Sequence, residues 1–282
     1  MKTTSLAWKK VAHMWNTYFT PPSRISSEEF VKYREWLGRL NPGRQPLKAL
    51  VLGATPEIRD LLAEFGYEAI VVDINPEMVR AMSSLMKRKN PKETVIIENW
   101  LKNDLPSGTF DVVIGDAVLP NIPWKFWERL LSEVKRVLKP DGTFVARAFC
   151  VPRAKTFQDM DELFDAFSTK EPSYRSALEF TLEVMIMFYD PEAHLATFQK
   201  SKEILESIGW DKGERTGRHA LDEILKLVWD FWVAKFADKV FIFAYRDEEE
   251  ALYSTFFEIK EIHESDSHYH EITPMFLMKP RS

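Results

Sequence analysis

The stretch from Leu47 to Asp73 constrains the fold more than any other part of the chain. It reads as a strand, a turn, a helix and a second strand: an apolar run ends at Gly53, apolar side chains recur at helical spacing over residues 58–65, and a second apolar run ends at Asp73. Asp73 follows Gly53 by twenty residues. Because parallel strands joined by a helix end at the same edge of a sheet, we expect the turn and the acid to meet one bound nucleoside.

Strands and helices continue to alternate after Asp73, which favours a doubly wound parallel sheet. We expect a helix from Asn75 to about Arg88, where an N-cap and a proline favour a helix start. The later elements predicted in this region are strands over residues 94–98, 108–115 and 143–149, a helix over 123–138, and a C-terminal hairpin of 254–263 with 271–279.

Predicted helices occupy the two regions outside this sheet. At the N-terminus we expect helices over Ser5–Phe19 and Ser27–Leu40, the second with a capping box of Ser26 and Glu29. The longer region predicts helices over residues 156–168, 172–189, 191–208 and 220–236, an elaboration on the functional edge of the sheet. Most of its aromatic side chains are expected to form the core of that elaboration.

The turn at Gly53 and the acid at Asp73 resemble two motifs of the class I S-adenosylmethionine-dependent methyltransferases. The resemblance implies an α/β fold with a doubly wound, mostly parallel seven-stranded sheet whose last strand is antiparallel. It also implies N-terminal helices and a helical cap inserted before the C-terminal hairpin. The cofactor implied is S-adenosyl-L-methionine.

The same resemblance suggests a division into three regions. Residues 1–46 would be a helical lid, 47–150 with 251–282 the cofactor-binding domain, and 151–250 a helical cap that contacts substrate. Tyr18 and Arg24, beside the Thr20–Ser23 helix breaker, are the candidate lid or substrate residues. The alternative for the N-terminal helices is simple packing on the sheet.

The first turn departs from the family pattern, because further glycines would stand at Thr55 and Glu57. This departure counts more strongly against a nicotinamide cofactor, since the carboxylate of Glu57 would repel a diphosphate. S-adenosylmethionine carries cationic groups instead, so Gly53, Ala54 and Glu57 are candidates for its methionine end. Glu57 can equally be a first-turn acid that favours the helix dipole.

Carried over by position, the remaining cofactor residues have distinct expected roles. Asp73 would hold the ribose hydroxyls through charge-assisted hydrogen bonds, and Ile74 would pack on the adenine. Asn99 occupies the slot of an acid that reaches the adenine amino group, and Trp100 would stack beside or cap the base. Asp116 would face the methionine ammonium or the substrate nucleophile, which makes it the candidate catalytic residue.

Methyl transfer needs alignment and exclusion of water more than it needs a base. If the acceptor is a hydroxyl, Asp116, His194 or His219 could serve as the base. No metal is expected, since no carboxylate pair completes a site with the histidines of the C-terminal hairpin, His263, His268 and His270.

The acceptor is expected to be a small or medium organic molecule. The Asn-Pro-Pro-aromatic tetrapeptide of amino-directed methyltransferases is missing where Gly115–Pro120 stands, which argues against adenine and glutamine amide acceptors. Two alternatives stay open: a catalytically silent module that binds the cofactor or its demethylated product, and an RNA methyltransferase. The second would use residues 1–48, which carry nine Lys or Arg against three Glu within a chain of net charge −5.

Composition fits a soluble globular protein with a full core, since 45% of the 282 residues are apolar. No run approaches the ~18 apolar residues of a membrane span, and the N-terminus has no apolar signal core. Cys150 is the single cysteine, which excludes an internal disulfide and fits a reducing compartment. The expected location is therefore the cytoplasm, with neither membrane nor nucleic acid as a partner.

Overall fold

The computed structural model describes residues 15–43, 45–266 and 269–281. These fall into two compact units. The sheet unit comprises residues 25–150 and 246–281 of the described chain, and the helical unit comprises 15–24 and 151–245. His268 and residues 5–14 of the first predicted helix lie outside the described residues.

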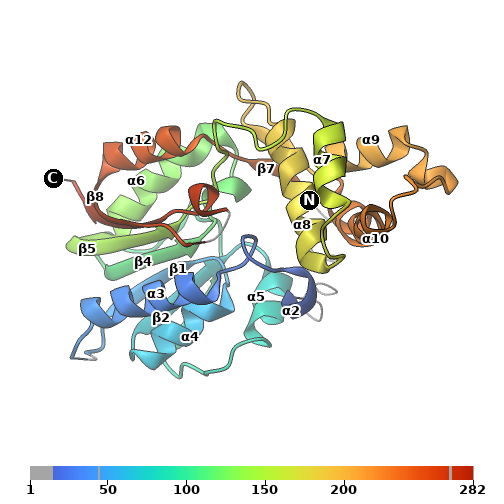
Figure 1. The fold of residues 1–282 in the computed structure, drawn as a ribbon. Coiled ribbons are helices and arrows are strands. Elements are labelled where there is room, and N and C mark those ends of the chain that lie inside the picture. The colour runs from blue at the N-terminus through green and yellow to red at the C-terminus, as the bar shows by residue number, and fades with distance from the viewer. Residues whose placement is uncertain (1–14, 44, 267–268, 282) are drawn as a thin grey trace. The chain divides into compact units, whose positions relative to one another are not determined.

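A seven-stranded sheet forms the centre of the sheet unit, with strand order β3-β2-β1-β4-β5-β9-β8 (Figure 1). Its last strand along the chain, β9, is antiparallel to both β5 and β8, whereas the pairs among β1 to β5 are parallel. The predicted fold class is therefore confirmed. The strands are β1 (Lys48–Leu52), β2 (Glu68–Asp73), β3 (Glu93–Ile97), β4 (Phe110–Asp116), β5 (Leu138–Arg147), β8 (Phe257–His263) and β9 (Met275–Pro280).

Helices cover both faces of this sheet. Figure 1 shows α3 and α4 on one face and α6 and α12 on the other. The helices of the unit are α3 (Ser27–Leu40), α4 (Pro56–Glu64), α5 (Pro76–Ser83), α6 (Trp127–Val137) and α12 (Arg246–Phe256), with short 3₁₀ turns η2 (Leu119–Asn121), η3 (Trp124–Phe126) and η6 (His270–Ile272).

Helix α3 packs on the sheet, which is one of the two alternatives that its sequence allows. Tyr33, Trp36 and Leu37 are fully buried in one hydrophobic cluster with Val51 of β1 and Val71 of β2. The predicted capping box is present, since the Ser26 side chain accepts from the Glu29 amide and the Glu29 side chain accepts from the Ser26 amide. A lid role for residues 1–46 stays a prediction.

The predicted start of the C-terminal hairpin is wrong by three residues. Residues 254–256 form the last turn of α12, and strand β8 begins at Phe257. The helix has Asp247, Glu248 and Glu249 in its first turn, where acids complement the helix dipole. It continues through residues 254–256, which were predicted as strand.

The helical unit is built mainly from helices joined by short turns. Helices α10, the π-helix η5 and α11 follow one another without a break, in agreement with the predicted helix over 220–236. The elements are α2 (Trp15–Tyr18), α7 (Met160–Phe167), α8 (Tyr174–Met187), α9 (Gln199–Ser207), η4 (Trp210–Lys212), α10 (His219–Leu227), η5 (Val228–Val233), α11 (Ala234–Phe236) and the antiparallel strands β6 (Leu195–Thr197) and β7 (Val240–Ile242).

The predicted helix over 191–208 is wrong in its first half. His194 has φ +54, outside the right-handed helical region, and Leu195–Thr197 pair with β7 before α9 begins at Gln199. This pairing joins residues that are far apart in the sequence, and the Asp190-Pro191 start signal does not encode it.

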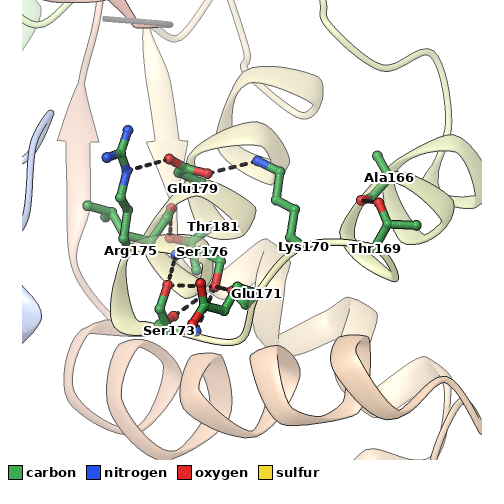
Figure 2. A network of polar contacts seen from close by, with 10 residues as sticks. Ala166, Thr169, Lys170, Glu171, Ser173, Arg175, Ser176, Glu179 and Thr181 are labelled. Atoms are coloured by element: carbon green, nitrogen blue, oxygen red, sulfur yellow. Dashed lines mark hydrogen bonds and ion pairs between the residues drawn. The ribbon is translucent and has the colours of Figure 1, made fainter.

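The start of α8 is held by a polar network, which Figure 2 shows. Ser173 caps the helix: its hydroxyl accepts from the Ser176 amide at 3.1 Å, and the Ser176 hydroxyl accepts from the Ser173 amide at 2.8 Å. One turn later Glu179 accepts from Lys170 at 2.8 Å and from Arg175 at 2.9 Å. Burial opposes ionisation of Glu179, but these two hydrogen bonds hold its pKa below the usual range.

Within the described residues, none of the helices combines the length and the apolar character needed to cross a membrane.

Candidate active site at the carboxyl edge of the sheet

Three predicted site residues lie at the ends of neighbouring strands. Leu52 of β1 lies in register with Val72 of β2 and with Gly115 of β4. The residues that come next in the chain are Gly53, Asp73 and Asp116. Because these strands are parallel, all three residues lie at one edge of the sheet unit.

Trp100 lies across the turn at Gly53. Gly53 has φ +97, a conformation that favours glycine, and its amide donates to the Val72 carbonyl at 2.9 Å. The Trp100 indole Nε1 donates to the same carbonyl at 2.6 Å. A Cβ on Gly53 would lie 3.7 Å from Trp100 Cζ2, so the indole covers the turn at van der Waals distance.

The carboxylate of Asp73 is buried and directed by local backbone amides. Its Oδ1 accepts from the Asn75 amide at 2.8 Å. Burial raises the pKa of Asp73, and the Asn75 and Ile74 amides oppose that rise. Asn75 in turn caps α5, as predicted, by accepting from the two following amides of the helix. Ile74 stands beside this acid with 55% of its surface exposed, an unusual exposure for a large apolar side chain.

Asp116 belongs to a buried chain of charges. Arg147, at the end of β5, donates to Asp116 Oδ1 at 3.0 Å through its Nη1 and to Glu29 Oε1 at 2.7 Å through its Nε. Glu29 comes from α3, so that helix contributes directly to the edge of the sheet. Burial raises the pKa of Asp116 to about 6; Arg147 opposes this rise, while Glu29 and Glu57 add to it.

A family model described as "Methyltransferase domain" matches residues 52–146. The match begins at the end of β1, spans Asp73, Trp100 and Asp116, and ends within β5. The strand order and the antiparallel last strand agree with this match. Residues 52–146 are a class I S-adenosylmethionine-dependent methyltransferase domain. S-adenosyl-L-methionine is the cofactor of this family, as predicted.

Solved structures resemble the chain in fold at low sequence identity. The CcbJ methyltransferase from Streptomyces caelestis is 13% identical with a TM-score of 0.58, covering 98% of each chain. A chain from Rhodobacter sphaeroides described as a Zn-dependent alcohol dehydrogenase is 14% identical with a TM-score of 0.59, covering 99% of each chain.

A third similar structure is the 1,6-didemethyltoxoflavin-N1-methyltransferase from Burkholderia thailandensis, solved with 1,6-didemethyltoxoflavin and S-adenosylhomocysteine bound. It is 11% identical with a TM-score of 0.54, covering 100% of this chain and 88% of that one. These similarities show the fold alone. No curated protein matches the sequence.

The methyltransferase domain fits a cationic, nucleoside-containing cofactor at this edge. Gly53 gives the turn its φ of +97, Asp73 supplies a carboxylate next to the turn, and Ile74 offers an exposed apolar surface. Ala54 is buried in the turn, and Glu57 lies in the first turn of α4.

Three other predicted site residues, Asn99, Tyr18 and Arg24, do not lie at the ends of β1, β2 or β4. Asn99 is exposed, and its Oδ1 accepts from the Leu101 amide at 2.9 Å, so one side-chain acceptor is used locally. Tyr18 and Arg24 belong to the helical unit. Tyr18 stacks on Phe231 with ring centroids 3.8 Å apart, which makes it part of that unit's aromatic core.

The candidate histidine bases are not part of the methyltransferase domain. His194 Nδ1 lies 3.2 Å from the Phe243 carbonyl oxygen in the helical unit, and His219 is an exposed first residue of α10. Residues 15–43, 45–266 and 269–281 hold no group of three or more His, Cys, Asp or Glu that could bind a metal ion.

Sequence reasoning missed the link from Asp116 through Arg147 to Glu29. One signal was available: Arg147 is the one charged residue of the predicted strand over residues 143–149, and a buried guanidinium needs carboxylate partners. Glu29 was explained by its helix cap, and nothing in the pattern indicates its second partner 118 residues away.

Proposed function

We propose that this chain transfers a methyl group from S-adenosylmethionine to a small or medium organic acceptor by direct displacement. The observation that carries the proposal is the hydrogen bond of 2.9 Å from the Gly53 amide to the Val72 carbonyl. Because Val72 immediately precedes Asp73, this bond keeps the Gly53 turn beside that acid, and we take this proximity as support for one site that holds a ribose and a methionine chain.

Each residue at this edge has a proposed part in holding the cofactor. Asp73 accepts hydrogen bonds from the ribose hydroxyls, and Trp100 provides an aromatic face for the base. Asp116 faces the cationic methionine end. Ile74 and Asn99 contact the adenine, while Gly53, Ala54 and Glu57 line the methionine side of the turn.

Methyl transfer depends more on the alignment of the acceptor with the methyl group than on proton transfer. When bound, S-adenosylmethionine supplies a methyl group already activated by its sulfonium. The residues of the edge hold the donor in a fixed orientation and keep water out. Asp116 is the proposed base for a hydroxyl acceptor; its pKa of about 6 leaves it mostly ionised at neutral pH, although Arg147 already occupies one oxygen.

A small acceptor is favoured over nucleic acid. The Gly115–Pro120 sequence after β4 lacks the tetrapeptide of amino-directed enzymes, and the similar Burkholderia thailandensis methyltransferase was solved with a small heteroaromatic molecule. We propose Tyr18 and Arg24 as acceptor-side residues, residues 1–46 as a lid, 151–250 as the substrate cap, and the cytoplasm as the site of action.

The proposal is tested by turnover. The full chain is incubated with S-adenosylmethionine and a panel of small hydroxyl, amine, thiol and carbon acids, and S-adenosylhomocysteine is quantified. We expect acceptor-dependent product with the wild type and a loss of at least about tenfold with Asp73→Ala. Product formed equally by both proteins would contradict the assigned site.

A silent binding module is the second candidate, favoured by the loss of two turn glycines and by the indole over the remaining one. Tight binding of S-adenosylhomocysteine with no turnover on any acceptor supports that candidate instead. Salt-dependent binding of RNA, with methylation of it, would support the third alternative.

A further inference from the structure

Glu29 forms two hydrogen bonds of different kinds from one buried carboxylate. Its Oε2 accepts from the Ser26 amide at 2.7 Å and completes the cap of α3. Its Oε1 accepts from Arg147 Nε at 2.7 Å. Glu29 and Arg147 are 1% and 2% exposed, so this ion pair is screened very little by solvent.

Asp116 completes the chain on the other side of Arg147. Its side chain is 12% exposed, which leaves it as the member closest to solvent. The Arg147 guanidinium therefore holds Asp116 through Nη1 while Glu29 holds the guanidinium through Nε. Because a guanidinium is planar and rigid, fixing one of its edges fixes the direction of the other.

The network of Asp116, Arg147 and Glu29 carries an excess of negative charge. One guanidinium faces two carboxylates. Glu57, at the start of α4, and the Tyr33 hydroxyl on α3 also interact electrostatically with Asp116. Tyr33 donates to the Gly115 carbonyl at 3.5 Å. With both carboxylates ionised, the trio has a net charge of −1, which is costly to bury without a compensating cation.

We propose that Glu29 is a positioning residue of the cofactor site, which acts through Arg147 to fix the Asp116 carboxylate and to leave this edge net negative for a cationic ligand end. The inference rests on the proposed function, since it takes S-adenosylmethionine as the ligand. It assigns to the N-terminal helix α3 an electrostatic role in addition to its packing on the sheet.

Removing the charge of Glu29 has two expected consequences. In Glu29→Gln, Asp116 no longer shares Arg147 with a second carboxylate, so its pKa falls below the wild-type value of about 6. The trio of Glu29, Arg147 and Asp116 also loses its net negative charge. Affinity for S-adenosylmethionine should then fall more than affinity for S-adenosylhomocysteine, because only the former carries the sulfonium charge.

The test measures binding of both ligands to the full chain between pH 5 and pH 8. For the wild type, affinity for S-adenosylmethionine should rise with pH through about 6 as Asp116 ionises. Glu29→Gln should move this midpoint down by at least about half a pH unit and lower the ratio of the two affinities several-fold. Ser26→Ala is the matched control, because it removes the other half of the capping box and keeps the charge of Glu29.

The outcomes separate the inference from the function on which it rests. An unchanged midpoint and ratio in Glu29→Gln, with normal wild-type binding, overturn the inference alone. Equal shifts in Ser26→Ala reduce Glu29 to a helix cap and overturn it as well. Absence of wild-type binding overturns the proposed function and the inference together.

Asp116→Asn provides a second test if Glu29→Gln does not fold. In this variant the affinity for S-adenosylmethionine should no longer fall as the pH is lowered through about 6. The preference for S-adenosylmethionine over S-adenosylhomocysteine should also shrink. If the affinity of Asp116→Asn still fell at acidic pH as in the wild type, another group would be titrating, and the inference would be overturned.

Discussion

At the scale of single residues, Gly53 and Trp100 lie against each other at the first turn of the proposed cofactor site. The family pattern has several glycines in this turn, whereas this chain keeps one and places an indole 3.7 Å from where its Cβ would be. The indole is fixed by its hydrogen bond to Val72, so it presents a defined face. Both residues can therefore be tested by substitution with clear directions.

Gly53→Ala should lower stability and ligand affinity together. Because φ is +97, an alanine there should cost about 1–2 kcal/mol of folding free energy, measured by urea denaturation. S-adenosylmethionine should also bind several-fold more weakly. Gly213→Ala is the matched control: Gly213 has φ +91 and no heavy atom of the described residues near its missing Cβ, so it should lose similar stability with unchanged affinity. Equal affinities in the two variants would remove Gly53 from the site.

Trp100→Ala should weaken S-adenosylmethionine binding by about 5- to 150-fold, because stacking of a base on an aromatic side chain contributes roughly 1–3 kcal/mol. Calorimetry measures the change. Tighter binding in this variant would have the opposite meaning, namely that the indole occupies the place of the nucleoside and must leave before the cofactor enters.

At the scale of elements, local signals predicted most of the sheet unit. The capping box of Ser26 with Glu29 and the Asn75 cap both form, because each depends on residues within one helical turn. Strands β6 and β7 were not predicted, since runs of three residues exist only through their pairing with each other. The predicted helix from Asn75 also extended too far, because α5 ends at Ser83.

Ser173→Ala should destabilise the protein by about 1 kcal/mol, the usual cost of losing a helix N-cap. The residue begins the network of Figure 2, where its hydroxyl accepts from the Ser176 amide. Chemical denaturation measures the change. Thr169→Ala, an exposed neighbour whose hydroxyl donates only to the Ala166 carbonyl, is the control and should change stability by less than about 0.5 kcal/mol. A Ser173→Ala variant as stable as this control would argue against the cap.

At the scale of the whole molecule, the sequence predicts two things unequally well. It predicts the architecture, but it does not predict which charged side chains meet in the site. Gly53 and Asp73 could be paired because strand-helix-strand units always bring such ends together. Glu29 and Arg147 could not, because their contact depends on how α3 packs on the finished sheet. The same holds for Glu249, a fully buried acid that no sequence pattern singles out.

Glu249 should make global stability fall with rising pH. It accepts from Tyr253 Oη at 2.7 Å and from Cys150 Sγ at 3.3 Å, and burial raises its pKa to about 7 despite these hydrogen bonds. Its protonated form stabilises the fold fully below the unfolded pKa, and this stability is lost as pH rises through about 7.

The unfolding free energy of the wild type should therefore drop between pH 5 and pH 8. In Glu249→Gln this drop should be smaller by about 2–3 kcal/mol, because the titrating carboxyl is gone. Urea denaturation at the two pH values measures this difference. Asp104→Asn, an exposed acid, is the control and should follow the wild type. Parallel losses in the wild type and Glu249→Gln would exclude a titrating Glu249.

Titration calorimetry with S-adenosylmethionine shows whether the turn at Gly53 and the carboxylate of Asp73 hold one nucleoside. The control is Asp111→Ala, since Asp111 pairs with Lys139 at 2.6 Å near the opposite ends of the strands. We predict binding at one site per chain for the wild type and for Asp111→Ala, and at least about tenfold weaker binding for Asp73→Ala. No binding by the wild type, or equal binding by Asp73→Ala, would contradict the account.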